Sequence, residues 1–254
     1  MNLRKAGMAF VFLCTASPLS ADALNVNIAE SLASHQRLDS DRKSDPMRRP
    51  DLVLEYFEIQ PGMSVLDIFS GAGYYTEIVS RVVGEKGRVV AHNNEAYMAY
   101  AKDALKERFL NKRLANVERL TAEANDLTLP DSTFDAALAI LTWHDFYYLD
   151  EENGWPAIDE KVMVEKLCAA LKPGAVLGVI DHVAVAGSDP ESTAQELHRI
   201  DPQRIKDDLA GSCFIFEGEI DVLNNPADDH KLPMYAEGIR GKTDRVVYRF
   251  RKAP

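Results

Sequence analysis

A short apolar strand that runs into a glycine-rich turn constrains the fold of this chain more than any other feature. Residues 64–68 are mostly apolar and lead into a turn that contains Gly71 and Gly73, which is typical of a buried parallel strand. Apolar residues then recur with helical spacing over 75–83, and a second buried run follows at 88–92. The order of strand, glycine turn, helix and strand predicts a right-handed βαβ unit.

The glycine turn also indicates what such a unit binds. Gly71 and Gly73 carry no side chain that would keep a ligand away from the backbone, and the amides that open the following helix carry partial positive charge. We therefore expect a nucleoside-bearing small molecule to lie across the strand ends. The alternative is that the glycines serve only tight packing.

Composition restricts the class of protein and the class of partner. The chain has 254 residues, of which 46% are hydrophobic and 27% charged, which suits a single α/β domain with a large core. Its formal net charge of −11 would repel phosphate backbones and anionic headgroups. We therefore expect a small-molecule substrate, and neither nucleic acid nor a membrane as partner. The oligomeric state stays open.

The first residues have the pattern of a secretory signal. Basic residues within 1–5 precede an apolar segment, 6–19, and Ala21-Asp22-Ala23 matches a small-residue cleavage site. We expect residues 1–23 to be removed and the mature protein to be periplasmic or secreted. A buried N-terminal helix is the alternative.

Two cysteines remain after the expected cleavage. Cys168 is predicted to lie on a helix and Cys213 at the start of a late strand. Export would permit a disulfide, but the sequence does not bring the two together. The chain has no CxxC and no clustered Cys/His spacing, so no structural zinc site is expected.

Residues 24–50 are polar and rich in arginine, and two interpretations of this arm stay open. It is either a solvated helical arm or a lid that folds over the ligand site, where an arginine would bind a carboxylate through two hydrogen bonds. The domain itself is expected over residues 51–254.

The rest of the chain alternates strands and helices. The alternation of residues in the last strand favours a half-exposed edge or a hairpin strand. Two parallel strands deliver His144-Asp145 and Asp181-His182 to the carboxyl edge of the sheet, where open α/β sheets hold their ligands. The later strands are predicted at 117–121, 136–141, 176–180, 214–223 and 244–251, and helices at 51–57, 96–109 and 161–171.

The segment VLDIFSGAGYYT resembles the first motif of the class I S-adenosylmethionine-dependent methyltransferases. Asp67 stands at the acid of that motif, Gly71 and Gly73 at its last two glycines, and Phe69 where the first glycine is usual. The resemblance implies a Rossmann-like α/β fold with a mostly parallel seven-stranded sheet, helices on both faces and a C-terminal antiparallel hairpin. It also implies S-adenosyl-L-methionine as cofactor. Tyr74 and Tyr75 directly follow the glycines and either face this cofactor or are packing aromatics.

Two further positions resemble the same family. Residues 121–135 are similar to the methyltransferase segment that contacts adenine, which puts Glu123 at the acid for the adenine amino group and Asn125 beside it. Asn93 ends the second strand, where these enzymes usually have a carboxylate for both ribose hydroxyls; an amide offers one acceptor oxygen instead of two. More narrowly, GAGYYT, WHDFYY, LHRID and RGKTDRVVYRFRK resemble a family of exported bacterial proteins described as predicted methyltransferases.

These features predict a transferase that methylates an unidentified small molecule. Methyl transfer needs a nucleophile that is held close to the methyl group, and a general base that removes its proton if it has one. Histidine suits the role of general base because its pKa lies near neutral pH. We rank His144 first as general base, then His182 and then His198, with Asp145, Asp181 or Asp201 able to orient an imidazole. The alternative for each histidine is that it caps a loop or is satisfied in the core.

Two other functions stay open. One is ligand binding without methyl transfer, which Phe69 and Asn93 favour because both depart from the methyltransferase pattern. The other is an acid-base or metal-assisted hydrolase that uses the same histidines and aspartates on this scaffold, since fold does not determine function.

Overall fold

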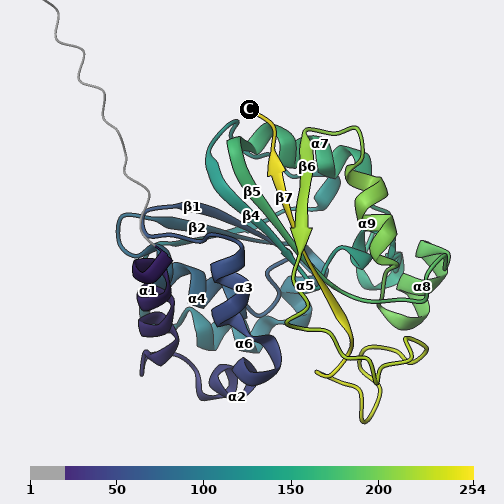
Figure 1. Cartoon of the computed structure of the whole chain (residues 1–254), viewed down its shortest axis with the longest axis horizontal. Helices are drawn as coiled ribbons and strands as arrows, with labels where there is room; N and C mark the ends of the chain where they lie inside the picture. The colour runs from purple at the N-terminus through teal and green to yellow at the C-terminus, as the bar shows by residue number, and fades with distance from the viewer. Residues whose placement is uncertain (1–20) are drawn as a thin grey trace, which may run out of the picture.

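The computed structural model describes residues 21–254, and most of the expected signal segment lies outside them. Seven strands form one sheet in the order β3-β2-β1-β4-β5-β7-β6 (Figure 1). The first five strands run parallel, and β7 is antiparallel to both of its neighbours, so the expected sheet is confirmed. The strands are β1 Ser64–Ile68, β2 Arg88–Asn93, β3 Val117–Thr121, β4 Phe134–Ile140, β5 Leu171–His182, β6 Phe214–Glu219 and β7 Arg245–Lys252.

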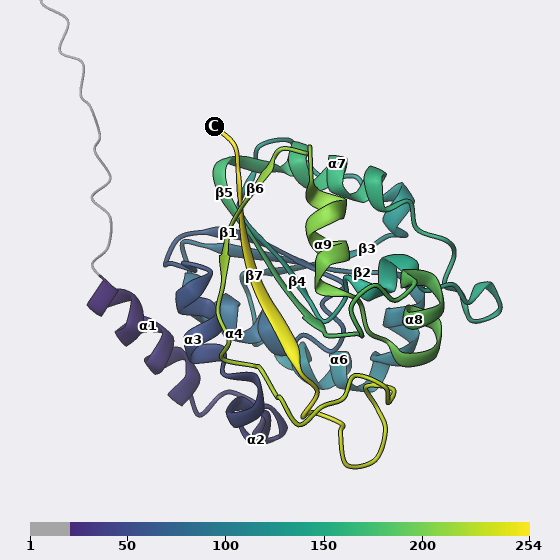
Figure 2. The ribbon, with the colours of Figure 1, turned by 45° about the vertical axis from the view of Figure 1, so that its right-hand side comes forward.

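Helices cover both faces of this sheet. Figure 2 shows α1, α3 and α4 on one side of the sheet and α7 with α9 on the other. No helix within residues 21–254 is both long and apolar enough to cross a membrane. The helices are α1 Ala21–Ala33, α2 Asp39–Arg48, α3 Pro50–Tyr56, α4 Tyr74–Val83, α5 Glu95–Tyr100, α6 Lys102–Arg108, α7 Glu160–Ala170, α8 Pro190–Leu197 and α9 Pro202–Leu209, and the short 3-10 helix η3 spans His144–Tyr147.

Alternate residues of the central strands supply two cores. Leu66 of β1 packs in the core that includes Leu167 of α7, whereas its neighbour Val65 packs in the core that includes Leu54 of α3 and Ile78 of α4. Because both faces of each central strand are buried, these strands are nearly continuous apolar runs in the sequence.

The last strand is a hairpin strand and not an edge. β7 lies between β5 and β6, so that β6 forms the edge of the sheet. Val247 faces one core and Tyr248 the other. The interpretation of 244–251 as a half-exposed edge is wrong, because alternation of residue types within a strand does not reveal that a second strand will cover its free side.

The predicted helix 96–109 consists of two shorter helices. The chain leaves helical geometry at Ala101, between α5 and α6. Tyr100, which the helical spacing places on the packed face, is 83% exposed, because the break turns the end of α5 away from the sheet.

Parts of the arm pack against the domain. Ile28 of α1 is buried in the core beneath α3 and α4. Arg37 is also buried and forms two hydrogen bonds of 2.7 Å with Asp45 of α2. Asp41 of α2 is paired with Arg108 of α6. Arg37 and Asp41 are therefore buried and paired, while other charges of the arm, such as the ion pair of Arg42 with Asp39, are exposed.

Cys168 of α7 and Cys213, which directly precedes β6, form a disulfide. The bond links residues that are 45 positions apart and ties α7 to the edge of the sheet. The fold thus decides the pairing that the sequence left open.

Candidate functional site

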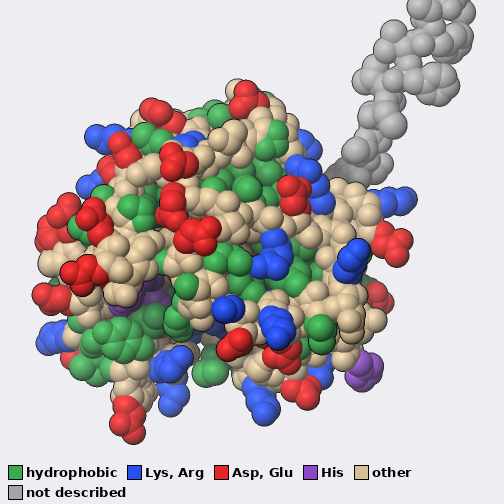
Figure 3. All heavy atoms as spheres, turned by 180° about the vertical axis from the view of Figure 1, so that it is seen from behind, with side chains coloured by type: hydrophobic (Ala, Val, Ile, Leu, Met, Phe, Trp, Pro, Cys, Tyr) green, Lys and Arg blue, Asp and Glu red, His purple; other side chains and the backbone are tan. Residues whose placement is uncertain are grey.

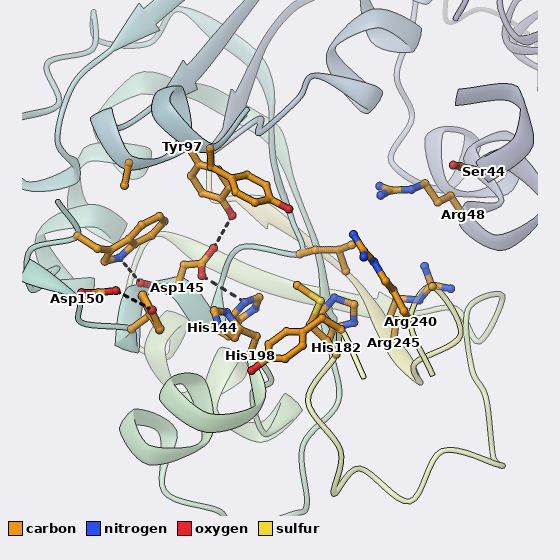
Figure 4. A pocket seen from close by; sticks show the side chains of 18 of the residues that line it. Ser44, Arg48, Tyr97, His144, Asp145, Asp150, His182, His198, Arg240 and Arg245 are labelled. Carbon is orange, nitrogen blue, oxygen red and sulfur yellow. Dashed lines mark hydrogen bonds and ion pairs between the residues drawn. The ribbon is translucent and has the colours of Figure 1, made fainter. Parts of the chain in front are cut away.

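A cavity of about 930 Å³ opens at the carboxyl ends of β4 and β5. Its walls come from α2, α5, η3, the end of α8 and the loop 224–242. On the face shown in Figure 3, histidine atoms lie in a recess bordered by hydrophobic and basic side chains. The histidines and aspartates of the cavity lie on one side, and its arginines lie on the other (Figure 4).

His144 is held by a buried carboxylate. It opens η3, directly beyond β4, and its backbone N–H donates to Oδ2 of Asp181 at 2.8 Å, while its Nδ1 lies 2.7 Å from Oδ1. Asp181 lies near the end of β5 and also accepts a hydrogen bond from the backbone N–H of His182. Because β4 and β5 are parallel neighbours, the two His/Asp dipeptides meet, and one carboxylate fixes both the position and the ring orientation of His144.

Asp145 faces the other ring nitrogen of His144. Its Oδ1 lies 3.3 Å from Nε2 of His144, and its Oδ2 accepts a hydrogen bond of 2.7 Å from the Tyr97 hydroxyl. Burial lowers the pKa of His144, but Asp145 and Asp181 more than offset this and raise it to about 9. His144 is therefore an imidazolium at neutral pH, so the role of general base requires that this proton leaves first.

The other two histidines of the cavity are neutral. Burial lowers the pKa of His182 to about 3 and that of His198 to about 4. Nδ1 of His182 lies 2.7 Å from the Thr243 hydroxyl. His198 ends α8 in the left-handed conformation, with φ of 50°, and its ring lies 5.6 Å from that of His144 between centroids. The neutral imidazole of His198 borders the cavity beside the charged one.

The opposite end of the cavity is cationic. Arg48, Arg240 and Arg245 line it, and none of them forms an ion pair with a carboxylate in the part of the chain that the structure describes. Arg245 is buried, and within residues 21–254 it donates only to the backbone carbonyls of Thr243 and Met47. Burial, together with the charge of Arg48, lowers the pKa of Arg245. A buried guanidinium without an acidic partner is costly, so this end suits an anionic group of a ligand.

The LHRID segment anchors the loop that completes the cavity. Arg199 is fully buried, and its guanidinium donates to both carboxylate oxygens of Asp228 at 2.8 and 3.2 Å. It also donates to the backbone carbonyls of Leu232 and Val183. Arg199 therefore holds the loop 224–242, which carries Arg240, against the end of α8. His198, the residue directly before Arg199, lies beside this loop.

The glycine loop lies beside this cavity and does not line it. Asn93, at the end of β2, accepts a hydrogen bond from the Gly71 N–H at 2.8 Å and donates to the Gly71 carbonyl at 3.0 Å. Phe69, Gly71 and Gly73 all have positive φ, which gives the loop its sharp turn. Asn93 thus uses both ends of its amide on the loop backbone, where a ribose contact was expected.

Aromatic rings cover the same loop. The Tyr97 ring lies over Gly71, with Cε1 3.8 Å from the point where a Cβ would stand. The centroid of the Phe69 ring lies 5.6 Å from that of Tyr97 and 5.6 Å from that of Trp155, and the Tyr97 and Trp155 centroids are 5.1 Å apart. The Tyr97 ring is therefore in ordinary van der Waals contact with the loop at Gly71, and Phe69 and Trp155 pack on Tyr97.

The other residues expected to bind the cofactor have partners inside the protein. Asp67 is buried away from solvent, and this burial raises its pKa to about 7. Glu123 borders a second, smaller pocket. The hydrogen bonds join Asp67 to the Thr76 hydroxyl, the Tyr74 hydroxyl to Asp45, Glu123 to the Glu95 N–H, and Asn125 to the Ala157 carbonyl and the Asp159 N–H.

The sequence did not predict the aromatic rings beside the glycine loop, nor the arginines that line one end of the cavity. Tyr97 has the helical spacing of a packing aromatic, and Trp155 stands in a loop without a recognised motif. Arg240 and Arg245 lie within RGKTDRVVYRFRK, which the resemblance singled out without a role. The lid interpretation of the arm did anticipate an arginine at the site, and Arg48 is that residue.

The sheet order, the glycine loop after β1 and the site at the ends of β4 and β5 define the Rossmann-like fold of the class I methyltransferases. Within this class, the family of protein-L-isoaspartate(D-aspartate) O-methyltransferases matches residues 36–125. A ubiquinone/menaquinone biosynthesis C-methyltransferase of Hydrogenovibrio crunogenus is 33% identical over 130 residues, 51% of this chain and 46% of that protein. The chain spans about half the length of the curated relatives it matches.

Two solved structures resemble the whole domain. A SAM-dependent methyltransferase from Aquifex aeolicus is similar with a TM-score of 0.55 and 25% identity, over 91% of this chain and 98% of that chain. A geranyl diphosphate C-methyltransferase from Streptomyces coelicolor A3(2) was solved with Mg²⁺, geranyl diphosphate and S-adenosyl-L-homocysteine. It has a TM-score of 0.56 at 11% identity, over 92% of this chain and 97% of that chain. Both similarities agree with the fold class.

Proposed function

We propose that this chain is an exported S-adenosylmethionine-dependent methyltransferase that acts on an anionic small molecule. The observation that carries the proposal is the cavity, which has a His/Asp cluster at one end, unpaired arginines at the other and the glycine loop beside it. The methyltransferase relatives support the reaction class. The disulfide supports export, since such bonds persist in oxidising compartments.

The fold and the relatives support S-adenosylmethionine as the cofactor. The Tyr97 ring at Gly71 lies where it would border a nucleoside on the glycine loop. We derive no step through the cofactor. Ligand binding without methyl transfer is the second candidate, since Phe69 and Asn93 depart from the methyltransferase pattern.

The residues of the cavity define what the chain itself does to a bound acceptor. Arg48, Arg240 and Arg245 bind its anionic group, and this orients the rest of the molecule toward the histidines. His144 holds positive charge between two carboxylates. The neutral imidazole of His198 accepts the proton that the acceptor loses.

Calorimetric titration with S-adenosylmethionine and S-adenosylhomocysteine tests the cofactor. The Trp155→Ala variant is expected to bind about tenfold more tightly than the wild type, because Trp155 packs on Tyr97, the ring that lies against Gly71, and separating an aromatic pair costs about 0.5–1.5 kcal/mol. Trp155 also contacts the rings of Phe69 and Tyr148. Tyr100→Ala is the matched control, since this tyrosine lines the cavity but is exposed.

The outcomes of this titration separate the two candidate functions. If neither the wild type nor Trp155→Ala gives saturable heat with either ligand, the methyltransferase proposal fails and ligand binding alone takes its place. If the wild type binds in the micromolar range, about −8 kcal/mol, and Trp155→Ala binds no better, the rings are not the obstacle that their packing indicates.

The charge of the acceptor is tested separately with inorganic pyrophosphate and succinate as probes. We expect saturable binding to the wild type and a loss of affinity of about tenfold or more in Arg245→Met, since a charge-assisted hydrogen bond contributes about 1.5–3 kcal/mol. Arg88→Met is the control, because Arg88 is half-exposed at the start of β2 and does not line the cavity. Equal affinity in all three proteins would refute the anionic acceptor.

A further inference from the structure

We propose that His144, Asp145 and His198 bind a divalent metal ion of the zinc type at the wall of the cavity. One ligand atom from each of the three residues lies within 4.8 Å of the others. His144 and Asp145 are buried, and His198 is partly buried at the cavity. Two imidazoles and one carboxylate are a donor set that zinc and other divalent transition metals accept.

The hydrogen bonds around the cluster orient its atoms as metal ligands. Metal-binding histidines commonly have their second ring nitrogen held by a carboxylate or a carbonyl. Nδ1 of His144 lies 2.7 Å from Oδ1 of Asp181, which leaves Nε2 to face the cluster. Oδ2 of Asp145 accepts the Tyr97 hydroxyl, which leaves Oδ1 beside Nε2 of His144. Both buried ligands are therefore fixed from behind, with the free atom of each pointing to the same place.

His198 supplies the third ligand from another part of the chain. Its φ of 50° is unusual for a residue other than glycine, and this backbone turns the ring from the end of α8 toward His144. The next residue, Arg199, is locked by Asp228. The backbone on either side of His198 is therefore fixed, by the end of α8 before it and by the buried ion pair of Arg199 after it.

The cluster leaves room for a further ligand, because its open side faces the cavity of about 930 Å³. Three protein ligands with an open position are typical of catalytic rather than structural metal sites. His182 does not belong to the cluster: its Nδ1 is bonded to the Thr243 hydroxyl. A bound ion would lower the pKa of a hydroxyl group that coordinates it. With the ion bound, this effect replaces His198 as the means by which an acceptor loses its proton.

The test uses the untagged chain, stripped with EDTA and titrated with Zn²⁺ by calorimetry and with Co²⁺ by visible absorption. We expect one ion per chain, with a Co²⁺ absorption band that saturates at the same ratio. His144→Gln and His198→Asn should each lose at least tenfold in affinity. Asparagine is chosen at 198 because it tolerates the left-handed backbone, so circular dichroism should show an unchanged fold.

Two further variants make the test specific. Asp181→Asn leaves all three ligands in place but weakens the orientation of His144, and it should cost about 10–100-fold in metal affinity. His35→Ala removes an exposed histidine of the arm and should bind as the wild type does. The proposal is overturned if the wild type shows no saturable one-to-one binding, or if His198→Asn binds Zn²⁺ as tightly as the wild type. The proposal does not depend on methyl transfer, because the metal alone is the probe.

Discussion

Replacing Arg199 with alanine is expected to lower the free energy of unfolding by about 3–5 kcal/mol, the usual cost of leaving one partner of a buried ion pair alone. Arg199 is fully buried, and its partner Asp228 is buried as well. The change also removes the hydrogen bonds to the carbonyls of Leu232 and Val183. The loop 224–242 would therefore detach from the sheet, and the cavity would lose the wall that carries Arg240.

Urea denaturation followed by circular dichroism measures this effect. Lys231→Ala is the control, because Lys231 lies in the same loop and its ion pair with Asp229 is exposed, where such a pair contributes about 1 kcal/mol or less. The double variant Arg199→Met with Asp228→Leu should recover part of the loss, since it removes both charges. A loss below about 1 kcal/mol in Arg199→Ala would contradict this role.

Replacing Arg108 with alanine is expected to cost a similar amount, about 3–5 kcal/mol, and to release the arm. Arg108 is buried between Asp41 of the arm and Glu77 of α4, at 2.7 Å from each. Glu77 keeps Arg81 and Arg113 as partners, but Asp41 loses its ion pair. The arm would thus be left with an unpaired buried carboxylate at its contact with the glycine loop, because Arg108 also donates to the Ala72 carbonyl.

Limited proteolysis reports the release of the arm, and denaturation reports the loss of stability. Cleavage within residues 34–50 should become faster in Arg108→Ala. Lys106→Ala, on the exposed side of the same helix α6, should leave both the cleavage rate and the free energy of unfolding unchanged. Protection of the arm equal to that in the wild type would mean that Ile28 and Arg37 hold it without Arg108.

Both arginines show why the site was only partly predictable. Glycine spacing, the βαβ pattern and the two His/Asp dipeptides are local, so they indicated the order of elements and the edge of the sheet at which His144, Asp145 and His182 meet. Arg199 and Arg108 act across 29 and 67 positions of the chain. Nothing in the local pattern around either residue indicates its partner.

The glycine loop shows the same limit for the cofactor. The motif from Asp67 to Gly73 correctly predicted a strand, a turn and the helix α4. The Tyr97 ring of α5 lies against Gly71, and Trp155, from the loop after η3, packs on Tyr97. These are tertiary contacts, so the motif alone indicated the loop and not the aromatic rings beside it.

By itself, the sequence determined the class of fold, because periodicity and glycine placement set which segments are strands and helices, and because strands buried on both faces must be apolar throughout. It also placed histidine and aspartate beyond two neighbouring strands. Only the tertiary structure decided that Arg37 and Asp41 of the polar arm are buried, that Cys168 pairs with Cys213, that His198 lies beside His144 and Asp145, and that three arginines share one cavity. Each of these features joins side chains that are distant in the sequence. The free energy of a buried charge or of an aromatic contact depends on which partner lies beside it, and only the folded chain brings those partners together.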